Sequence, residues 1–504
     1  MAWSTLRVPA RSDADGPERL TVSESFRSIT PMFAPTMSCV LHRGRWWSAD
    51  ELDAMARHFR SAVLEAVGDS GRLIATALPA TPEGVALFVA LTSLSSPVLL
   101  LGPDPRAWRT EPAPPAGTPI VFPPSLARLG PEGATLGLAP LVLPNRASGP
   151  EGGAPVVPLQ APGIVLFTSG STGLPRPVFR RMATLIAGVA ARNRAFGLAP
   201  GAGIITGVSL SSGQGVTFLV ASIILGGKLG LLEPVDHRAA LHALALPEFH
   251  CWRATPHFVD VLGRCALPGP PVIPRVCILS SPIARDVFDA FTERFGVPVR
   301  QTYSSTETGP VAYDDAPPSA VRRETVGRPL RGVEICVGDH PTSPLTLGEI
   351  GRIWLRNSWQ MAGYGFPPLV ERPGDVDGWW PTRDLGSLEA DGHLTLRGRV
   401  DDCIRTRENR LVNLTAVATA ILEIPGVTDV AVVPLDSHAG ATFGAVVQCG
   451  PSLALTAVRT SLADVLPPSS WPRVVETVRA LPRLSNGKAD RRACITRLSG
   501  RYPE

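Results

Sequence analysis

One stretch, Gly163–Val178, constrains the fold of this 504-residue chain more than any other. It reads GIVLFTSGSTGLPRPV, an apolar run that ends in glycines and hydroxyl side chains. A strand followed by such a loop presents backbone N–H groups and hydroxyls to a phosphate, and no Gly-Lys-Ser/Thr of the Walker loop follows here. A surface turn rich in serine, threonine and glycine is the alternative interpretation. The predicted phosphate-binding residues are Thr168, Ser169, Gly170, Ser171, Thr172, Gly173 and Arg176.

The composition predicts a soluble protein with several cores. A chain of this length is expected to form about two to four domains. The formal charge of +4 is small and the basic residues are scattered, which indicates neither a nucleic-acid partner nor a membrane surface. The eight cysteines include no C-x-x-C pair, so neither a disulfide framework nor a zinc site is predicted. No signal peptide or membrane-spanning run is visible, and we expect a cytoplasmic protein.

Apolar spacing predicts alternating helices and strands in the first part of the chain. Residues 51–70 have helical spacing, 72–78 and 97–101 indicate strands, and 83–94 indicate a helix between them. This alternation is typical of a parallel sheet. Residues 103–160 are rich in proline and glycine and are expected to form a winding connection.

The rest of the chain changes its pattern twice. A second α/β stretch runs from Gly203 to Val311, short strands and turns extend from Gly332 to Leu396, and a compact α+β pattern begins after Arg399. The predicted fold class is α/β. It comprises a large N-terminal domain of α/β subdomains plus a small β-rich subdomain, and a small α+β C-terminal domain.

Four further sequence blocks follow the phosphate loop in order. They are QTYSSTETGP at 301–310, GEIGRIWLRN at 348–357 with Gly363-Tyr364, GWWPTRDLGSLEADGHLTLRGRVDD at 378–402 and LPRLSNGKADRR at 481–492. In this order and at these separations, the five blocks resemble the adenylate-forming superfamily of acyl-CoA synthetases, peptide-synthetase adenylation domains and luciferases. The similarity covers roughly residues 50–500.

The resemblance implies two domains and a two-step reaction. An N-terminal AMP-binding domain, residues 1–399, would hold the acid and the nucleotide, and a small mobile C-terminal domain, residues 400–504, would turn about Asp401. The family uses ATP and Mg²⁺ to convert a carboxylic acid into an acyl-adenylate. A thiol, often that of coenzyme A, then displaces AMP. A loop-capping aspartate is the alternative interpretation of Asp401.

The resemblance also assigns the groups that handle charge at the reacting centre. Lys488 of the C-terminal domain would bridge the carboxylate and the α-phosphate, because negative charge develops between two anions there. Glu307 would bind Mg²⁺ as a hard oxygen ligand, and Thr306 would contact phosphate. Asp384 is suited to accept both ribose hydroxyls. A solvated lysine and a surface glutamate are the alternatives for Lys488 and Glu307.

Further nucleotide contacts follow from the same resemblance. Tyr303 is expected to stack on adenine, with a Ser-Ser-Pro segment on the other face, although an ordinary core tyrosine is an alternative. Arg399 matches the family's nucleotide-contacting arginine, and Arg410 would face the phosphates in one conformation. The remaining predicted contacts are Ser280, Ser281, Pro282 and Thr302.

The acid-binding pocket is expected at the borders that family members use. Amino-acid-activating relatives carry an aspartate near Ser211, and the lack of a carboxylate in VSLSSGQG argues against an amino acid. The small Ser304 leaves the pocket deep, which predicts a bulky, mostly apolar acid. Trp252 fits a plain core residue equally well. The predicted pocket residues are Ser212, Gly213, Trp252, Thr255, Leu279 and Ser304.

Several positions depart from the family pattern. The usual Pro-Lys-Gly is Pro175-Arg176-Pro177, in which arginine keeps the charge while Pro177 stiffens a loop that must close on pyrophosphate. The usual Tyr-Gly is Tyr303-Ser304, and the usual Thr-Gly-Asp is Thr382-Arg383-Asp384. Arg407 and Glu408 replace two glycines in a loop that lines the pantetheine tunnel of CoA-using relatives.

These matches and departures predict an acyl-CoA ligase that uses ATP, Mg²⁺ and coenzyme A and retains AMP recognition. One alternative is an enzyme confined to thioester formation on an acyl-adenylate that a partner ligase supplies. Others are a stand-alone domain that loads a carrier protein, an amide synthetase on the same fold, and a non-catalytic acyl-nucleotide binder. Retention of Lys488, Glu307 and Asp384 argues against the binder. The Pro/Ala/Arg-rich composition suggests a role in natural product biosynthesis.

Overall fold

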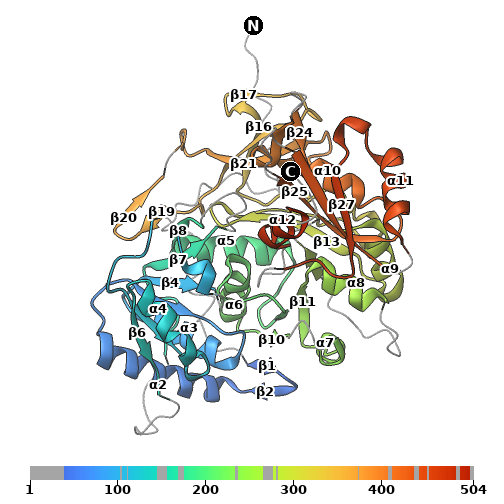
Figure 1. Ribbon diagram of the computed structural model, residues 1–504. Coiled ribbons are helices and arrows are strands. Elements are labelled where there is room, and N and C mark those ends of the chain that lie inside the picture. The colour runs from blue at the N-terminus through green and yellow to red at the C-terminus, as the bar shows by residue number, and fades with distance from the viewer. Residues whose placement is uncertain are drawn as a thin grey trace, which may run out of the picture.

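The computed structural model describes residues 39–102, 105–110, 112–144, 156–168, 175–232, 237–264, 276–279, 282–372, 374–406, 411–435, 442–450, 453–483 and 489–499. Two large sheets and a smaller one form the N-terminal part, and an α+β unit follows (Figure 1). This arrangement confirms the predicted fold class.

An eight-stranded sheet is built around β7 (Gly163–Phe167), the apolar run that precedes the phosphate loop. β7 pairs in parallel with β4 (Val98–Leu101), which pairs in parallel with β3 (Ile74–Ala77). Nearly every residue of these strands is buried, as is typical of parallel strands covered on both faces. The outer strands are β20 (Leu369–Glu371), β19 (Gly363–Phe366) and β8 (Pro177–Arg181) on one side, and β5 (Pro119–Phe122) and β6 (Ala139–Val142) on the other.

Helices of the first part pack against this sheet. α2 (Ala49–Val67) begins with a capping box of Ser48 and Glu51, and one of its faces is buried. α3 (Pro82–Thr92) begins at the N-cap Thr81 and is buried almost throughout. The predicted helices and strands between residues 51 and 101 are therefore confirmed.

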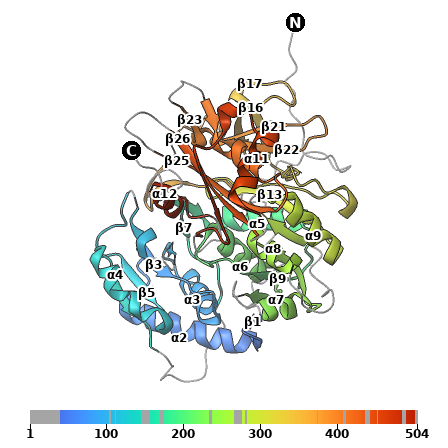
Figure 2. The ribbon, with the colours of Figure 1, turned by 45° about the vertical axis from the view of Figure 1, so that its right-hand side comes forward.

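A nine-stranded sheet forms the second large layer. Its strands in spatial order are β15 (Arg328–Pro329), β14 (Gly309–Tyr313), β13 (Val299–Ser305), β12 (Val276–Leu279), β11 (Phe249–Arg253), β9 (Gly203–Thr206), β10 (Leu229–Leu231), β1 (Val40–His42) and β2 (Arg45–Trp47). α5 (Met182–Ala195) and α6 (Gly213–Leu225) lie between the two large sheets (Figures 1 and 2), and one apolar cluster joins these helices to both sheets. A second cluster joins the other face to α7 (His237–Leu244), α8 (Pro256–Arg264) and α9 (Arg285–Phe295).

A five-stranded antiparallel sheet forms the predicted β-rich subdomain. Its strands are β17 (Ser343–Pro344), β16 (Glu334–His340), β18 (Gly351–Arg356), β21 (Trp380–Leu388) and β22 (Leu394–Arg399). The C-terminal unit comprises β23 (Cys403–Arg405), β24 (Leu411–Asn413), α10 (Leu414–Ile421), β25 (Val427–Leu435), β26 (Thr442–Cys449), α11 (Leu455–Val465), β27 (Val474–Val478) and α12 (Arg491–Ser499).

The C-terminal unit contacts the large part at α8 and α9. Glu423 accepts from Arg323 Nη2 at 2.6 Å and from Arg285 Nε at 3.4 Å, and Gly426 N donates to Asp286 Oδ2 at 2.9 Å. Apolar side chains of both units belong to the same buried cluster. The contact therefore combines ion pairs with apolar packing.

Residues 103–160 differ from the winding connection expected from the sequence. β5 and β6 of this segment extend the eight-stranded sheet, with α4 (Gly130–Thr135) between them. Each of these strands spans four residues, and short strands beside prolines carry little periodicity. The 3₁₀ turns are η1 (Pro105–Trp108), η2 (Pro124–Leu129), η3 (Pro318–Ala320), η4 (Val400–Asp402) and η5 (Pro468–Ser470).

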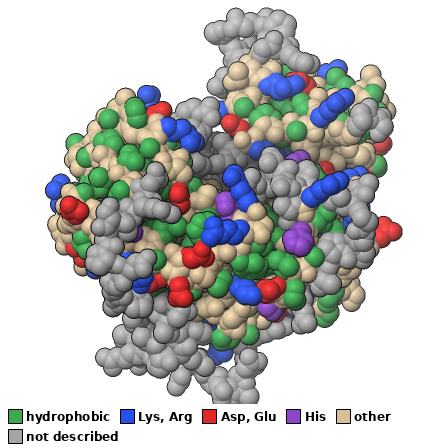
Figure 3. Space-filling model, turned by 90° about the horizontal axis from the view of Figure 1, so that it is seen from below, with side chains coloured by type: hydrophobic (Ala, Val, Ile, Leu, Met, Phe, Trp, Pro, Cys, Tyr) green, Lys and Arg blue, Asp and Glu red, His purple; other side chains and the backbone are tan. Residues whose placement is uncertain are grey.

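The surface and helices carry two further observations. On the face shown in Figure 3, basic and acidic side chains of the described residues are interspersed. Among the residues that the structure describes, no helix combines the length and hydropathy needed to cross a membrane.

Candidate active site

Tyr303, Asp384 and Arg399 meet between the nine-stranded and the five-stranded sheet. Tyr303 lies on β13, and Asp384 on β21 is opposite Arg399 on β22. The Tyr303 hydroxyl donates to Asp384 Oδ2 at 2.5 Å, and Arg399 Nη1 lies 3.9 Å from Asp384 Oδ1. Burial, and then the negative charge of Asp384, holds the pKa of Tyr303 well above its ordinary value. The phenol therefore stays protonated and orients the carboxylate.

A second carboxylate, Asp401, extends this cluster toward the C-terminal unit. Its Oδ2 accepts from Arg383 Nη1 at 3.0 Å and from Arg399 Nη2 at 3.4 Å. Burial lowers the pKa of Arg399, but the charges of Asp384, Asp401 and Asp402 together outweigh it and raise that pKa. Arg383 replaces the glycine of the family pattern, and its side chain donates to Asp401, the predicted hinge residue.

The predicted metal ligand Glu307 lies in the turn between β13 and β14. Arg180 of β8 is only 2% exposed and donates to Thr306 O at 3.1 Å and to Trp359 O at 2.6 Å. Burial lowers the pKa of Arg180 to about 10, and the charge of Glu307 acts in the opposite direction. At Gly309, which has a φ of +69°, an added Cβ would come within 2.9 Å of the guanidinium. The turn is therefore built around a buried charge.

Tyr364 connects this turn to the phosphate loop. Its hydroxyl donates to Glu307 Oε1 at 3.0 Å, and the Arg176 guanidinium carbon lies 3.7 Å from the centre of its ring. Thr168 and Arg176, which flank the loop, are joined by two hydrogen bonds of 3.1 Å, from Arg176 N to Thr168 Oγ1 and from Thr168 N to Arg176 O. Pro177 follows as the first residue of β8. Contacts therefore run from Thr168 through Arg176 and Tyr364 to the predicted metal ligand Glu307.

Part of the predicted acid pocket approaches the same turn. A Cβ placed on Gly213 would lie 3.6 Å from Thr306 Oγ1, so the first turn of α6 comes close to it. Ser212 is the N-cap of α6, and its hydroxyl accepts from Gly215 N at 3.0 Å. Ser304 is half-buried on β13, two residues before Thr306. The structure therefore brings the first turn of α6, with Ser212 and Gly213, to the turn that follows Ser304 on β13.

Trp252 faces the other side of the nine-stranded sheet. It is fully buried, and its ring centroid lies 5.5 Å from that of Phe258 and 5.9 Å from that of Phe291. Neighbouring residues of a strand point to opposite faces, so Arg253 faces α6 while Trp252 faces α8 and α9. The structure therefore favours the core interpretation of Trp252 over the pocket wall.

Three other predicted residues have simpler surroundings. Thr255 Oγ1 accepts from Phe258 N at 3.3 Å, which caps α8. Thr302 Oγ1 donates to Ala312 O at 2.8 Å within the sheet, and Pro282 is exposed. The predicted residues outside the described residues are Ser169, Gly170, Ser171, Thr172, Gly173, Ser280, Ser281, Arg410 and Lys488, together with Arg407, Glu408 and the side chain of Leu279.

The sequence interpretation did not assign four residues that the structure places in or beside this group. Tyr364 lies within one of the recognised blocks but had no assigned role. Arg180 and Arg253 lie in strands whose other residues are mostly buried, and Gln214 lies in the first turn of the largely apolar helix α6. The signal that could have identified them is a charged or amide side chain in a mostly apolar segment.

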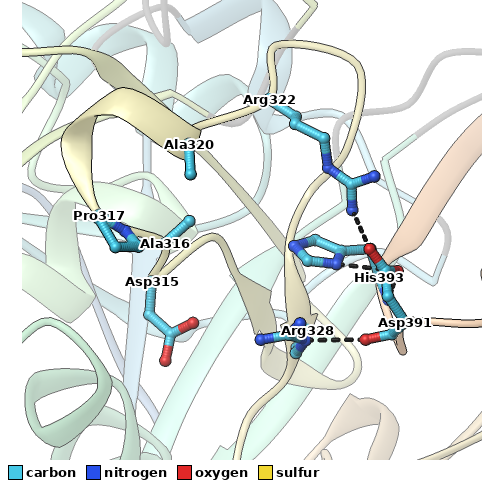
Figure 4. Close-up of a pocket in the computed structure, with 8 residues that line it drawn as sticks. All are labelled: Asp315, Ala316, Pro317, Ala320, Arg322, Arg328, Asp391 and His393. Carbon is cyan, nitrogen blue, oxygen red and sulfur yellow. Dashed lines mark hydrogen bonds and ion pairs between the residues drawn. The ribbon is translucent and has the colours of Figure 1, made fainter.

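A separate groove of about 400 Å³ lies between the segment before β15 and the β21–β22 turn (Figure 4). Arg322 Nη2 donates to Asp391 Oδ2 at 2.9 Å, and Arg328 Nε donates to Asp391 O at 2.9 Å. His393 Nδ1 lies 3.0 Å from Asp391 Oδ1. None of the predicted site residues lines this groove, so it is not the candidate active site.

Known proteins of similar sequence and structure identify the family. A family described as AMP-binding enzyme matches residues 135–365. The chain is 30% identical over 356 residues to a probable 2-succinylbenzoate–CoA ligase of Mycobacterium tuberculosis, covering 67% of this chain and 85% of that protein. It is 27% identical over 488 residues to novobiocin biosynthesis protein H of Streptomyces niveus, covering 91% and 79%. The structure of the amide bond synthetase McbA from Marinactinospora thermotolerans matches with a TM-score of 0.76 at 25% identity, covering 94% of this chain and 99% of that one.

The fold and the site define an adenylate-forming enzyme. The chain belongs to the AMP-binding, adenylate-forming superfamily, which confirms the resemblance seen in the five blocks. Its similar proteins include a CoA ligase and an amide bond synthetase, so the family alone leaves the acyl acceptor open.

Proposed function

We propose that this chain is an acid–thiol ligase that activates a bulky carboxylic acid with ATP and transfers the acyl group from the adenylate to coenzyme A. The observation that carries the proposal is the convergence of Tyr303, Asp384 and Arg399 beside the Glu307 turn. Asp384, held by the Tyr303 hydroxyl, would accept the ribose hydroxyls. Lys488 keeps its predicted role between carboxylate and α-phosphate.

The residues of the turn fit a magnesium ion that accompanies ATP. Glu307 offers a carboxylate whose Oε1 accepts from Tyr364, and a Mg²⁺ ion bound together with substrate phosphates needs one or two protein carboxylates. The bound ion would neutralise phosphate charge. Arg180 would keep the backbone of Thr306 in place, and Tyr364 would orient Glu307.

The acceptor divides the proposal into three candidates: coenzyme A, an amine and a carrier protein. A CoA ligase is favoured by the similarity to the probable 2-succinylbenzoate–CoA ligase. An amine acceptor is favoured by the match to McbA, described as an amide bond synthetase, over 94% of this chain. A carrier protein would serve as acceptor in the third variant of the same chemistry.

A panel of carboxylic acids incubated with ATP and Mg²⁺ tests the proposal through release of pyrophosphate. Coenzyme A, a carrier protein and amines are then added separately, and the products are identified by mass. Pyrophosphate release followed by acyl-CoA formation supports the acid–thiol ligase, and amide formation supports the second candidate. Thioester formation from a synthetic acyl-adenylate and coenzyme A without pyrophosphate release from ATP would point to the enzyme confined to the second step. Failure of both steps would contradict the proposed function.

A further inference from the structure

A buried arginine lies at the carboxyl end of β11. Arg253 is 5% exposed and faces the first turn of α6. Its Nε donates to Gln214 Oε1 at 3.0 Å, its Nη2 donates to the same oxygen, and its Nη1 donates to Ile278 O at 3.2 Å and to Ala254 O. The guanidinium therefore spans α6, β11 and β12.

These contacts place the arginine among the predicted acid-pocket residues. Gln214 directly follows Gly213, which approaches Thr306, and Ile278 directly precedes Leu279. Ser212 is the N-cap of the same helix. Arg253 thus links the first turn of α6, which carries Ser212, Gly213 and Gln214, to β12, which ends at Leu279.

The groups at this end of the predicted pocket are charged and polar, not apolar. A buried guanidinium loses the hydration that it has in water, and burial lowers the pKa of Arg253 to about 10. The N-terminus of α6 adds positive potential at the same place. An anionic oxygen group placed beside them would be stabilised by both positive potentials.

We propose that Arg253 and Gln214 form the far end of the acid pocket and select an acid whose tail carries a second anionic oxygen group, a carboxylate or a sulfonate. This inference rests on the proposed function. It changes the expected substrate from a mostly apolar acid to one with an apolar body and an anionic tail. Arg253 is assigned as the residue that determines specificity.

Binding of stable acyl-adenylate analogues tests the inference without requiring turnover. Acyl-sulfamoyl adenosines are compared by calorimetry in two matched pairs, adipoyl against hexanoyl and 4-carboxybenzoyl against 4-isopropylbenzoyl. The adenosine part is the same within each pair, so the difference reports the acyl pocket. We expect the carboxylate-bearing member of at least one pair to bind about 10-fold or more tightly than its apolar partner.

Two variants and a matched control identify the cause of that preference. Arg253→Met is expected to abolish the preference, weakening the carboxylate analogue while leaving the apolar analogue within about twofold, and Gln214→Leu is expected to reduce it. Arg192→Met is the control, because Arg192 is equally buried but donates to Thr217 one turn further along α6. We expect this control to keep the preference.

The outcomes separate failure of the inference from failure of the proposed function. Equal or tighter binding of the apolar members by the wild-type protein would overturn the inference and leave the adenylate site standing. A preference that survives Arg253→Met, or a loss shared equally by both members, would reduce Arg253 to a structural role. Failure of all four analogues to bind would overturn the inference together with the proposed function.

Discussion

The nucleotide side and the acid side of the site are held together in different ways. Tyr303 comes from the nine-stranded sheet and meets Asp384 and Arg399 of the five-stranded sheet through polar contacts, and the side chains of Asp384 and Arg399 are 20% and 35% exposed. Arg253 lies beneath the first turn of α6, where it donates to Gln214, and its guanidinium also donates to the carbonyl oxygen of Ile278 in β12. The charged groups of the nucleotide side are therefore less dependent on the core than Arg253, although Tyr303 is 5% exposed and belongs to the main apolar cluster. Arg180 combines both features, because it is buried and also holds the Glu307 turn.

The largest effect is expected for Arg180→Met. Thr306 O and Trp359 O lose their donor, and breaking a buried charged contact typically costs about 3 kcal/mol or more of stability. We also expect pyrophosphate release to fall by about 1,000-fold and to require more Mg²⁺, because the Glu307 turn loses its support. Urea unfolding and a Mg²⁺ titration measure the two effects.

Arg180→Lys and Arg192→Met complete that experiment. Lysine retains a charge and should recover part of the activity. Arg192→Met removes an equally buried guanidinium remote from the turn, so stability should fall while the Mg²⁺ requirement stays unchanged. Wild-type Mg²⁺ dependence in a folded Arg180→Met protein would contradict the positioning role.

Asp384→Ala is expected to separate binding from stability. Loss of an ionised acceptor of two hydrogen bonds should weaken AMP binding by about 100-fold, while stability falls by only about 1–3 kcal/mol because the buried Tyr303 hydroxyl loses its acceptor. Calorimetric titration of AMP checks this. Asp391→Asn, in the remote groove of Figure 4, is the matched control and should leave AMP binding unchanged. Equal AMP affinity in Asp384→Ala and the wild type would remove Asp384 from the nucleotide site.

Tyr364→Phe tests the link between the phosphate loop and the turn at a finer scale. The ring under Arg176 remains while the hydrogen bond to Glu307 Oε1 is lost. A single hydrogen bond to a charged group is worth about 1.5 kcal/mol, so the Mg²⁺ concentration for half-maximal pyrophosphate release should rise by about 10-fold. Tyr364→Leu removes the ring as well, which frees Arg176 from its contact, so ATP binding should be roughly two- to fivefold tighter than in Tyr364→Phe. Identical behaviour of both variants would show that the hydroxyl alone matters.

The smallest functional effect is expected for Trp252→Phe. The structure places Trp252 in the core against Phe258 and Phe291, so stability should fall by about 1 kcal/mol without a change in the acids accepted. Thermal unfolding and the acid panel measure the two quantities. A changed acid preference would restore Trp252 to the pocket wall and weaken the contrast between the two sides.

The sequence predicted the family and the blocks in which Asp384, Arg399 and Glu307 stand, and the roles of these residues stay predictions. The strand that carries Arg399 was expected from local patterns, whereas Glu307 lies in a turn. Arg180 and Arg253 were not assigned, because each lies in a short strand with little periodicity and bonds to residues that are distant in sequence. A shift of one residue in strand register would exchange the faces of the sheet to which Trp252 and Arg253 point, and local sequence patterns do not fix that register.

The contact of Arg176 with Tyr364 has a consequence for how a phosphate would be received. A cation over an exposed aromatic ring is stabilised by about 0.5–1 kcal/mol, and an anion that recruits the guanidinium must replace that contact. The phosphate affinity that Arg176 contributes is therefore roughly two- to fivefold lower than that of an arginine with no ring contact to break. When Arg176 moves from the ring to a phosphate, Tyr364 keeps its hydrogen bond to Glu307. Phosphate binding in the loop therefore changes the surroundings of the residue that orients the carboxylate expected to bind the metal.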